Sequence, residues 1–163
     1  MSNDEWPVAS RAYGFELPML LFAGFRSIID ELHAELGRHG HQDLRPAHGF
    51  AMQAIGVGGA TATEVGRRLG ISKQAAGKTV ERLEALGYVQ RASDGVDRRR
   101  KLVRLTPRGI EALTLSATIF SDIRARWART LGQPRVEDME AALRAMAQGE
   151  ALRLDAAGWF GAS

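Results

Sequence analysis

Four consecutive cations, from Arg98 to Lys101, carry the clearest chemical signal in this 163-residue sequence. Beside a nucleic acid such a run neutralises phosphates and releases condensed counterions. Arginine also suits a narrow minor groove, where the negative potential is enhanced. Between Arg91 and Arg108 there are seven cations and two acids, whereas the net charge of the whole chain is only +3. The basic surplus is therefore local, as in a nucleic-acid footprint, although an isolated charge run is usually a solvated face.

A β-hairpin is predicted to hold these cations. Residues 88–92 and 101–105 are rich in strand-forming side chains. Ser93 to Gly95, between the two segments, has the composition of a turn. The predicted hairpin would therefore carry the four cations at its tip.

Two short helices joined by a tight turn are predicted directly before the hairpin. Thr61 and Glu64 have the spacing of a capping box, which marks a helix start. Gly70 suits a left-handed C-terminal cap, and Ser72 is a favourable N-cap for a second helix that would reach about Leu86. This is the pattern of a helix-turn-helix, in which the second helix enters the major groove.

The second helix has one apolar and one polar face. Ala76, Val80 and Leu83 recur at helical spacing and are predicted to be buried. On the other face, Gln74 is placed to reach base edges, and Gly77 would let the backbone approach DNA closely. An ordinary two-helix corner with a solvated face is the alternative. The basic hairpin directly behind the pair favours the DNA-binding interpretation.

The segment from Asp97 to Gly109 reads D-x-R-x-x-x-V-x-L-T-x-x-G. This pattern resembles the wing signature of the MarR (multiple antibiotic resistance regulator) family of winged helix-turn-helix repressors. Residues 69–80, L-G-I-S-K-Q-A-A-G-K-T-V, resemble the recognition-helix region of that family. The segment from Thr106 to Gly109 matches its entry into a long helix, and the order of elements resembles the family over about residues 17–147.

The resemblance implies two groups of DNA contacts. In the wing, Arg99 would enter the minor groove, and Asp97 would orient it through a charge-assisted hydrogen bond. The neighbouring Arg98 and Arg100 would contact phosphates. Four side chains of the second helix would face the major groove and its phosphates: Ser72, Lys73, Gln74 and Lys78.

The expected fold is mainly α with a small β-hairpin wing, and three segments are expected. Residues 1–45 would form an N-terminal arm and a dimerisation helix. Residues 46–106 would form the winged helix-turn-helix DNA-binding domain. Residues 107–163 would form C-terminal dimerisation helices and a tail, of which 148–163 extend past the resemblance.

Three helices outside residues 46–106 have apolar residues at heptad-like spacing, which is typical of a packed helix pair. The first is predicted from Pro18 to about Arg38, and its seam is Phe22, Phe25, Ile29, Leu32 and Leu36. The others have seams of Ile110, Leu113, Ala117, Phe120, Trp127 and Leu131, and of Val136, Met139, Leu143 and Met146. An intramolecular core is the alternative, but the resemblance implies a homodimer on a pseudo-palindromic site.

Several functional classes are disfavoured by what the sequence lacks. It contains no cysteine, which excludes disulfides, thiol nucleophiles and thiolate zinc sites. It has no Gly-rich phosphate loop, nucleophile elbow or His-Glu-x-x-His motif, so we expect neither an enzyme nor a bound cofactor. No run of about 18 apolar residues is present and the N-terminus is acidic, so we expect a cytoplasmic protein without a membrane span.

The four histidines lie within sixteen residues: His33, His39, His41 and His48. They suggest a zinc or proton-sensing site, but with no cysteine a closed tetrahedral set is hard to assemble, and we expect a solvated loop without metal. The resemblance also implies a small aromatic or phenolic effector. Phe25, Met52 and Arg124 could line its cleft, although none lies in a signature motif. Core packing, or an intersubunit ion pair for Arg124, is the alternative.

Together these patterns predict a homodimeric, sequence-specific regulator that binds double-stranded DNA and acts as a ligand-responsive repressor. Two other classes remain open at this point. A winged helix can serve as a protein-interaction module, and the histidine cluster could make the protein a metal sensor.

Overall fold

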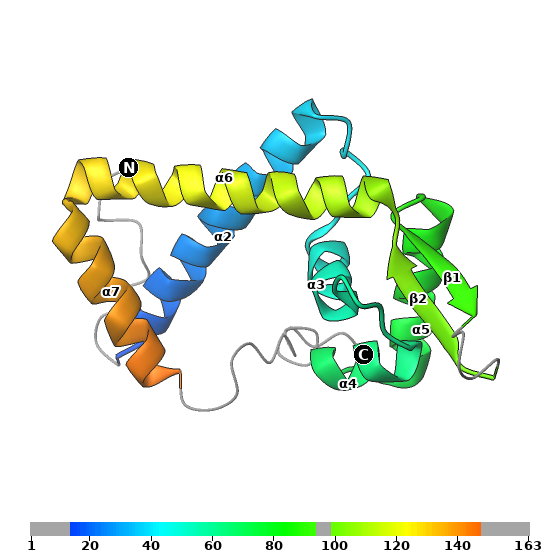
Figure 1. Cartoon of the computed structure of the whole chain (residues 1–163). Helices are drawn as coiled ribbons and strands as arrows, with labels where there is room; N and C mark the ends of the chain where they lie inside the picture. Colours follow the sequence, from blue (N-terminus) through cyan, green and yellow to red (C-terminus); the bar gives the residue numbers. More distant parts are fainter. Residues whose placement is uncertain (1–13, 94–98, 148–163) are drawn as a thin grey trace.

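A computed structural model describes residues 14–93 and 99–147 of the chain. Its elements, in chain order, are α2 (Glu16–Arg38), α3 (Pro46–Ile55), α4 (Ala62–Leu69), α5 (Lys73–Ala85), β1 (Val89–Ser93), β2 (Lys101–Leu105), α6 (Pro107–Leu131) and α7 (Gln133–Met146). The long helix α6 joins a compact group of short elements to α7, and α2 crosses α6 and packs against it (Figure 1). The predicted fold class, mainly α with a small hairpin, is confirmed. We call residues 46–106, from α3 to β2, the winged-helix unit.

The helix ends of the winged-helix unit follow the predicted capping signals. Thr61 Oγ1 accepts a hydrogen bond from the Glu64 amide at 3.2 Å, and the Glu64 carboxylate accepts one from the Thr61 amide at 2.7 Å. This capping box starts α4, and Gly70 ends it with a φ of 68°. Ser72 caps α5 by accepting from the Ala75 amide at 3.1 Å. Local sequence therefore sets the turn between the two helices.

The hairpin pairs β1 with β2 in antiparallel register, from Val89↔Leu105 to Ser93↔Lys101. Ser93 thus lies in a strand and not in the turn, and Lys101 begins β2 and does not belong to the tip. The expected strand over 101–105 is confirmed, but the placement of Ser93 in the turn and of Lys101 at the tip was wrong, because the two residues pair with each other and add one pair to the ladder. Ala60 adds a third, short partner, since it exchanges two backbone hydrogen bonds with Val103 at 3.0 and 2.9 Å.

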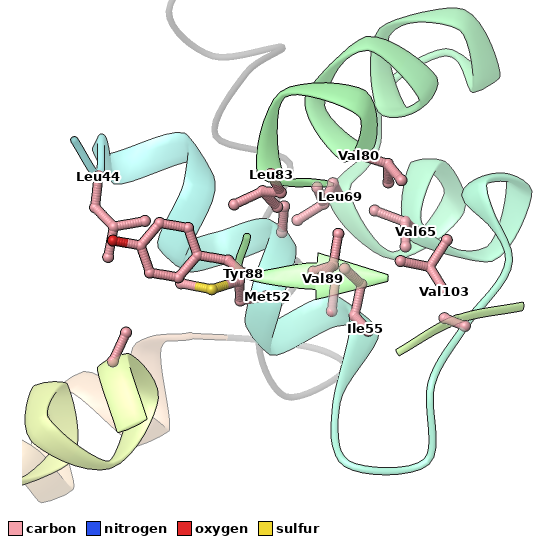
Figure 2. Close-up of a cluster of buried hydrophobic side chains, with 14 of the residues drawn as sticks. Leu44, Met52, Ile55, Val65, Leu69, Val80, Leu83, Tyr88, Val89 and Val103 are labelled. Atoms are coloured by element: carbon pink, nitrogen blue, oxygen red, sulfur yellow. The ribbon is translucent and has the colours of Figure 1, made fainter. Parts of the chain in front are cut away.

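The core lies mainly within the winged-helix unit (Figure 2). The predicted stripe of α5 is confirmed, because Ala76, Val80 and Leu83 are all fully buried. Met52 is also fully buried, so it packs in this core and is not available to line an open cleft as expected. Figure 2 shows the Tyr88 ring between Leu44 and Met52, with its hydroxyl directed away from α5.

The helices outside the winged-helix unit bury only part of their predicted seams. In α2, Leu32 and Leu36 are buried, whereas Phe22 and Phe25 are 42% and 45% exposed. In α6 the most buried apolar side chains are Ala112, Ile119 and Ile123, and the seam residues Leu113, Phe120 and Trp127 pack against the core only in part. As a result, Ile110, Leu131, Met139, Leu143 and Met146 of the predicted seams are exposed in the single chain.

Helix α7 is fastened to α6 by a two-bond ion pair. Arg124 Nε and Nη2 donate to the two carboxylate oxygens of Glu140 at 2.5 and 2.9 Å. The hydrogen bonds and charge of Glu140 raise the pKa of Arg124. Arg124 therefore pairs within its own chain, which differs from the intersubunit pair and the cleft position expected from the sequence.

Candidate nucleic-acid interface

The outer face of α5 carries the predicted major-groove residues. Lys73, Gln74 and Lys78 are exposed, as is Ser72, although the Ser72 hydroxyl oxygen is already used to cap the helix. At Gly77, a Cβ would have no other described atom of the chain within 4 Å. The helix thus presents polar and basic side chains around a position where its backbone is uncovered.

The wing beside α5 is basic on its exposed side. Lys101, Arg104 and Arg91 project from the strands, and Arg99 and Arg100 stand just before β2 with exposed side chains. The two remaining predicted wing residues, Asp97 and Arg98, lie outside the described residues. Arg99 and Arg100 thus lie in the same winged-helix unit as the exposed face of α5.

Two ion pairs attach the wing to the helices that it flanks. Arg91 Nε contacts Glu84 Oε2 at 3.2 Å, which ties β1 to the last turn of α5. Arg100 Nη2 contacts Glu64 Oε1 at 2.6 Å, which ties the start of β2 to the first turn of α4. Hydrogen bonds from Thr61, with a smaller contribution from the charge of Arg100, hold the pKa of Glu64 below its usual value. Sequence reasoning missed the second pair because its partners are 36 residues apart.

The first turn of α6 packs against the C-terminal end of α5 through the T-x-x-G motif, which runs from Thr106 to Gly109. Thr106 Oγ1 accepts from the Gly109 amide at 3.2 Å, which caps α6, and it donates to the Gly87 carbonyl at 2.6 Å. The Thr106 amide donates to the Tyr88 carbonyl at 3.0 Å. A Cβ at position 109 would overlap that same carbonyl oxygen, so only glycine fits there. The motif therefore fixes the end of α5 against the start of α6.

The Tyr88 hydroxyl lies at the centre of a polar cluster next to this docking point. It donates to Asp43 Oδ1 at 2.6 Å and accepts from Arg108 Nη2 at 3.0 Å. The Arg108 guanidinium also lies over the Tyr88 ring, 4.6 Å from its centroid. Burial, reinforced by the hydrogen bond to Asp43, raises the pKa of Tyr88 to about 12.

His41 belongs to this cluster and not to a solvated loop, so that expectation was wrong. Its side chain is only 2% exposed, and Nδ1 lies 3.0 Å from the Tyr88 hydroxyl. The other histidines are used separately, because His39 bonds the Glu35 carbonyl and His48 caps α3. Within residues 14–93 and 99–147, no group of three or more His, Asp or Glu side chains is arranged to hold a metal ion.

An open pocket of about 370 Å³ lies between α2 and the loop that leads to α3. Asp30, His33, Gln42 and Arg45 supply its polar lining. Phe25, Met52 and Arg124, which the sequence suggested for an effector cleft, do not line this pocket. Among the described helices, none is long and apolar enough to cross a membrane.

The sequence model of the MarR family matches residues 42–100, which span most of the winged-helix unit. No curated protein matches this chain in sequence. The structure resembles FabT from Streptococcus pneumoniae in complex with DNA, with a TM-score of 0.71 at 18% identity over 81% of this chain and 93% of FabT.

Two further solved structures have the same fold. The DNA complex of MepR from S. aureus aligns with a TM-score of 0.63 at 20% identity, over 82% of this chain and 96% of MepR. The apo form of MarR from E. coli aligns with a TM-score of 0.62 at 21% identity, over 80% of this chain and 96% of MarR.

Proposed function

We propose that this chain is a transcriptional regulator that binds double-stranded DNA, because residues 42–100 match the sequence model of the MarR family. The observation that carries the proposal is the juxtaposition of the exposed face of α5 with the basic wing. FabT and MepR, which share the fold, are in complex with DNA. Helix α5 would enter the major groove, and the wing would reach the adjacent minor groove.

Within this proposal the contacts divide into base readout and phosphate binding. Gln74 is exposed near the start of α5, where an amide can pair with an adenine edge. Lys73, Lys78 and Arg98 would bind phosphates. Arg99 would enter the minor groove with Asp97 orienting it, as the family resemblance implies. Arg100 would have to leave Glu64 before it could bind a phosphate.

A homodimer is the second part of the proposal. Phe22 and Phe25 on α2, and Leu143 on α7, are exposed in the single chain although they lie on predicted packing seams. Large exposed apolar side chains on two helices that both pack against α6 favour burial against a second copy. A two-fold dimer would present two α5 helices about one turn of DNA apart, on a pseudo-palindromic operator.

We further propose that the protein acts in the cytoplasm as a repressor that a small aromatic or phenolic anion releases. The mechanism is a shift between two states of the dimer. In one of these states the two α5 helices would have a separation that does not fit the two half-sites. A ligand that binds better to that state would weaken operator binding.

Selection of binding sites from random duplex DNA at two salt concentrations tests the proposal. We expect an inverted repeat with half-site centres about 10 bp apart and an affinity that falls steeply with salt. The absence of an enriched motif, together with a salt-insensitive complex with another protein, would instead identify a protein-interaction module.

A further inference from the structure

The Tyr88 hydroxyl joins three elements that are far apart in the sequence. His41 and Asp43 belong to the loop between α2 and α3, and Arg108 belongs to the first turn of α6. Tyr88 itself lies three residues after Ala85, the last residue of α5. Arg108 also contacts Asp43 Oδ2 and the Gly40 carbonyl, each at 3.3 Å. One buried oxygen atom is therefore the meeting point of the α2–α3 loop, the end of α5 and the start of α6.

The protons in this cluster can be placed in only one way. Tyr88 has a single hydroxyl proton, and the 2.6 Å contact assigns it to Asp43 Oδ1. A guanidinium can only donate, so Arg108 donates to the Tyr88 oxygen. The remaining neighbour, His41 Nδ1, must then also donate to that oxygen. His41 therefore carries a proton on Nδ1, and its buried Nε2 has no hydrogen-bond partner among the described residues.

The charges support this arrangement. Burial of Asp43 favours its neutral acid, but the hydrogen bond from Tyr88 and the charge of Arg108 outweigh that effect and hold its pKa below the usual value. Asp43 is thus ionised at neutral pH and accepts from both Tyr88 and Arg108. Each member of the cluster makes directional bonds, so the three elements fit together in one orientation, whereas apolar contacts alone would tolerate several.

The backbone of Tyr88 acts at the same point. Its amide donates to the Leu83 carbonyl in the last turns of α5 at 2.9 Å, and its carbonyl accepts from Thr106 at 3.0 Å. Both the backbone and the side chain of this residue therefore connect α5 to α6. Helix α6 in turn packs against α2 and carries α7, the elements with the exposed apolar surface.

We propose that Tyr88 is a positioning residue that sets the angle of α5 to α6, and with it the separation of the two recognition helices in the dimer. Its hydroxyl does not contact DNA in this proposal. The angle between α5 and α6 is a property of a single chain. Its effect on the choice of operator rests on the proposed function.

The test uses Tyr88→Phe, which removes the hydroxyl and keeps the ring. The control is Ser116→Ala, because the Ser116 hydroxyl bonds the Ala112 carbonyl within α6 and joins no two elements. Since the sequence has no cysteine, spin labels can be attached at Ala85→Cys on α5 and Ala125→Cys on α6, both exposed positions. Dilution with unlabelled protein isolates the distance within one chain.

We expect the label distance to be broader or shifted in Tyr88→Phe and unchanged in Ser116→Ala. A distribution that superimposes on that of the parent would overturn the proposal. Circular dichroism checks folding, and if Tyr88→Phe does not fold, Asp43→Asn serves as the second variant. Asp43→Asn removes the charge that holds the cluster and should broaden the same distribution; a distribution identical to that of the parent would overturn the proposal equally.

DNA-binding measurements distinguish a failure of this inference from a failure of the proposed function. Binding is measured to the selected operator, to a single half-site and to operators with one base pair added or removed between half-sites. Tyr88→Phe removes the three hydrogen bonds of the hydroxyl, so it should lower the preference for the native spacing by about threefold or more and leave half-site binding unchanged. A parent that binds none of the duplexes would contradict the proposed function, whereas the label distances would still decide the role of Tyr88.

Discussion

Glu64 uses its two carboxylate oxygens for two different tasks. Oε2 closes the capping box of α4 by accepting from the Thr61 amide at 2.7 Å, and Oε1 holds Arg100 of the wing at 2.6 Å. A helix cap and a wing cation therefore share one side chain. Any phosphate that binds Arg100 must compete with Glu64.

Glu64→Gln is expected to release Arg100 and to keep the cap, because glutamine also serves at this position of a capping box. The slope of the logarithm of the binding constant against the logarithm of the salt concentration should become steeper, by up to about the amount that one added phosphate contact contributes. Binding titrations at several salt concentrations measure this slope. Glu111→Gln, an equal change of charge at an exposed position of α6, is the control. Equal slopes for the two variants would mean that Glu64 does not restrain Arg100.

Arg99→Ala is expected to weaken operator binding by about 1–3 kcal/mol with the fold intact, because a groove-inserted arginine would be lost. Arg129→Ala removes the same charge from the exposed last turn of α6 and should change affinity little. Fluorescence anisotropy with the selected operator measures both variants. If the two lose the same affinity, the effect comes from net charge and the wing assignment is wrong.

Gln74→Ala and Lys78→Ala should have different effects, because the proposal gives one a base and the other a phosphate. Gln74→Ala should change the base preferred at one position of each half-site. Lys78→Ala should weaken binding to all duplexes alike and reduce the salt slope by about one. Site selection with each variant measures the preference profile. An unchanged profile for Gln74→Ala would count against direct readout by that side chain.

Alanine at two glycines should have opposite effects on stability. Gly109→Ala places a methyl group on the Tyr88 carbonyl and should lower the free energy of unfolding by about 1–3 kcal/mol. Gly77→Ala meets open space and should raise it by up to about 1 kcal/mol, because alanine favours helix. Gly77→Ala should nevertheless weaken operator binding, since the methyl group would separate α5 from the groove. Urea denaturation and anisotropy measure the two quantities, and unimpaired binding by Gly77→Ala would rule out a close backbone approach.

His48 makes the stability of α3 depend on pH. Its Nδ1 accepts from the Arg45 amide at 3.1 Å, which requires the neutral ring. Burial, followed by the charges of Arg82 and Arg45, lowers the pKa of His48 below 6.5. Just below pH 6.5 the unfolded chain therefore binds more protons than the folded chain. The resulting stability is complete above that pH and is lost as the pH falls through the lower, folded-state pKa.

His48→Gln should keep this cap, because glutamine can accept at the same position, and should remove the titration. Its free energy of unfolding should match that of the parent at neutral pH and fall less on acidification. His48→Ala, which lacks both the cap and the titration, should be less stable at either pH but also show the flatter dependence. Denaturant unfolding across this range measures the slopes. Parallel curves for the parent and His48→Gln would contradict the assignment.

Features that depend on neighbouring residues were predictable from the sequence. The caps at Thr61, Ser72 and Thr106 and the left-handed turn at Gly70 each rest on a few adjacent positions, and all are confirmed. The basic hairpin behind α5 was likewise predictable from composition, although the pairing of Ser93 with Lys101 was not.

Contacts between distant residues were not predictable. His41 meets Tyr88 across 47 positions, and no local pattern distinguishes it from a loop histidine. In α6 the heptad spacing was correct, but spacing alone does not decide which of two neighbouring stripes faces the same chain. Ala112, Ile119 and Ile123 are the buried residues of α6, whereas the predicted seam is only partly buried, at Leu113, Phe120 and Trp127, and is exposed at Ile110 and Leu131.

Helix α6 has 25 residues and begins where Thr106 and Gly109 dock on the end of α5. At a rise of 1.5 Å per residue it is a lever of about 37 Å. A rotation of about 5° about the first turn of α6 would move the far end of the helix by about 3 Å, close to the 3.4 Å rise of one base pair. A small rotation at the start of α6, where it contacts the end of α5, therefore produces a large displacement at the far end of the helix. Cavities or substitutions near Tyr88 should accordingly change the operator that the protein selects more than the strength with which it binds.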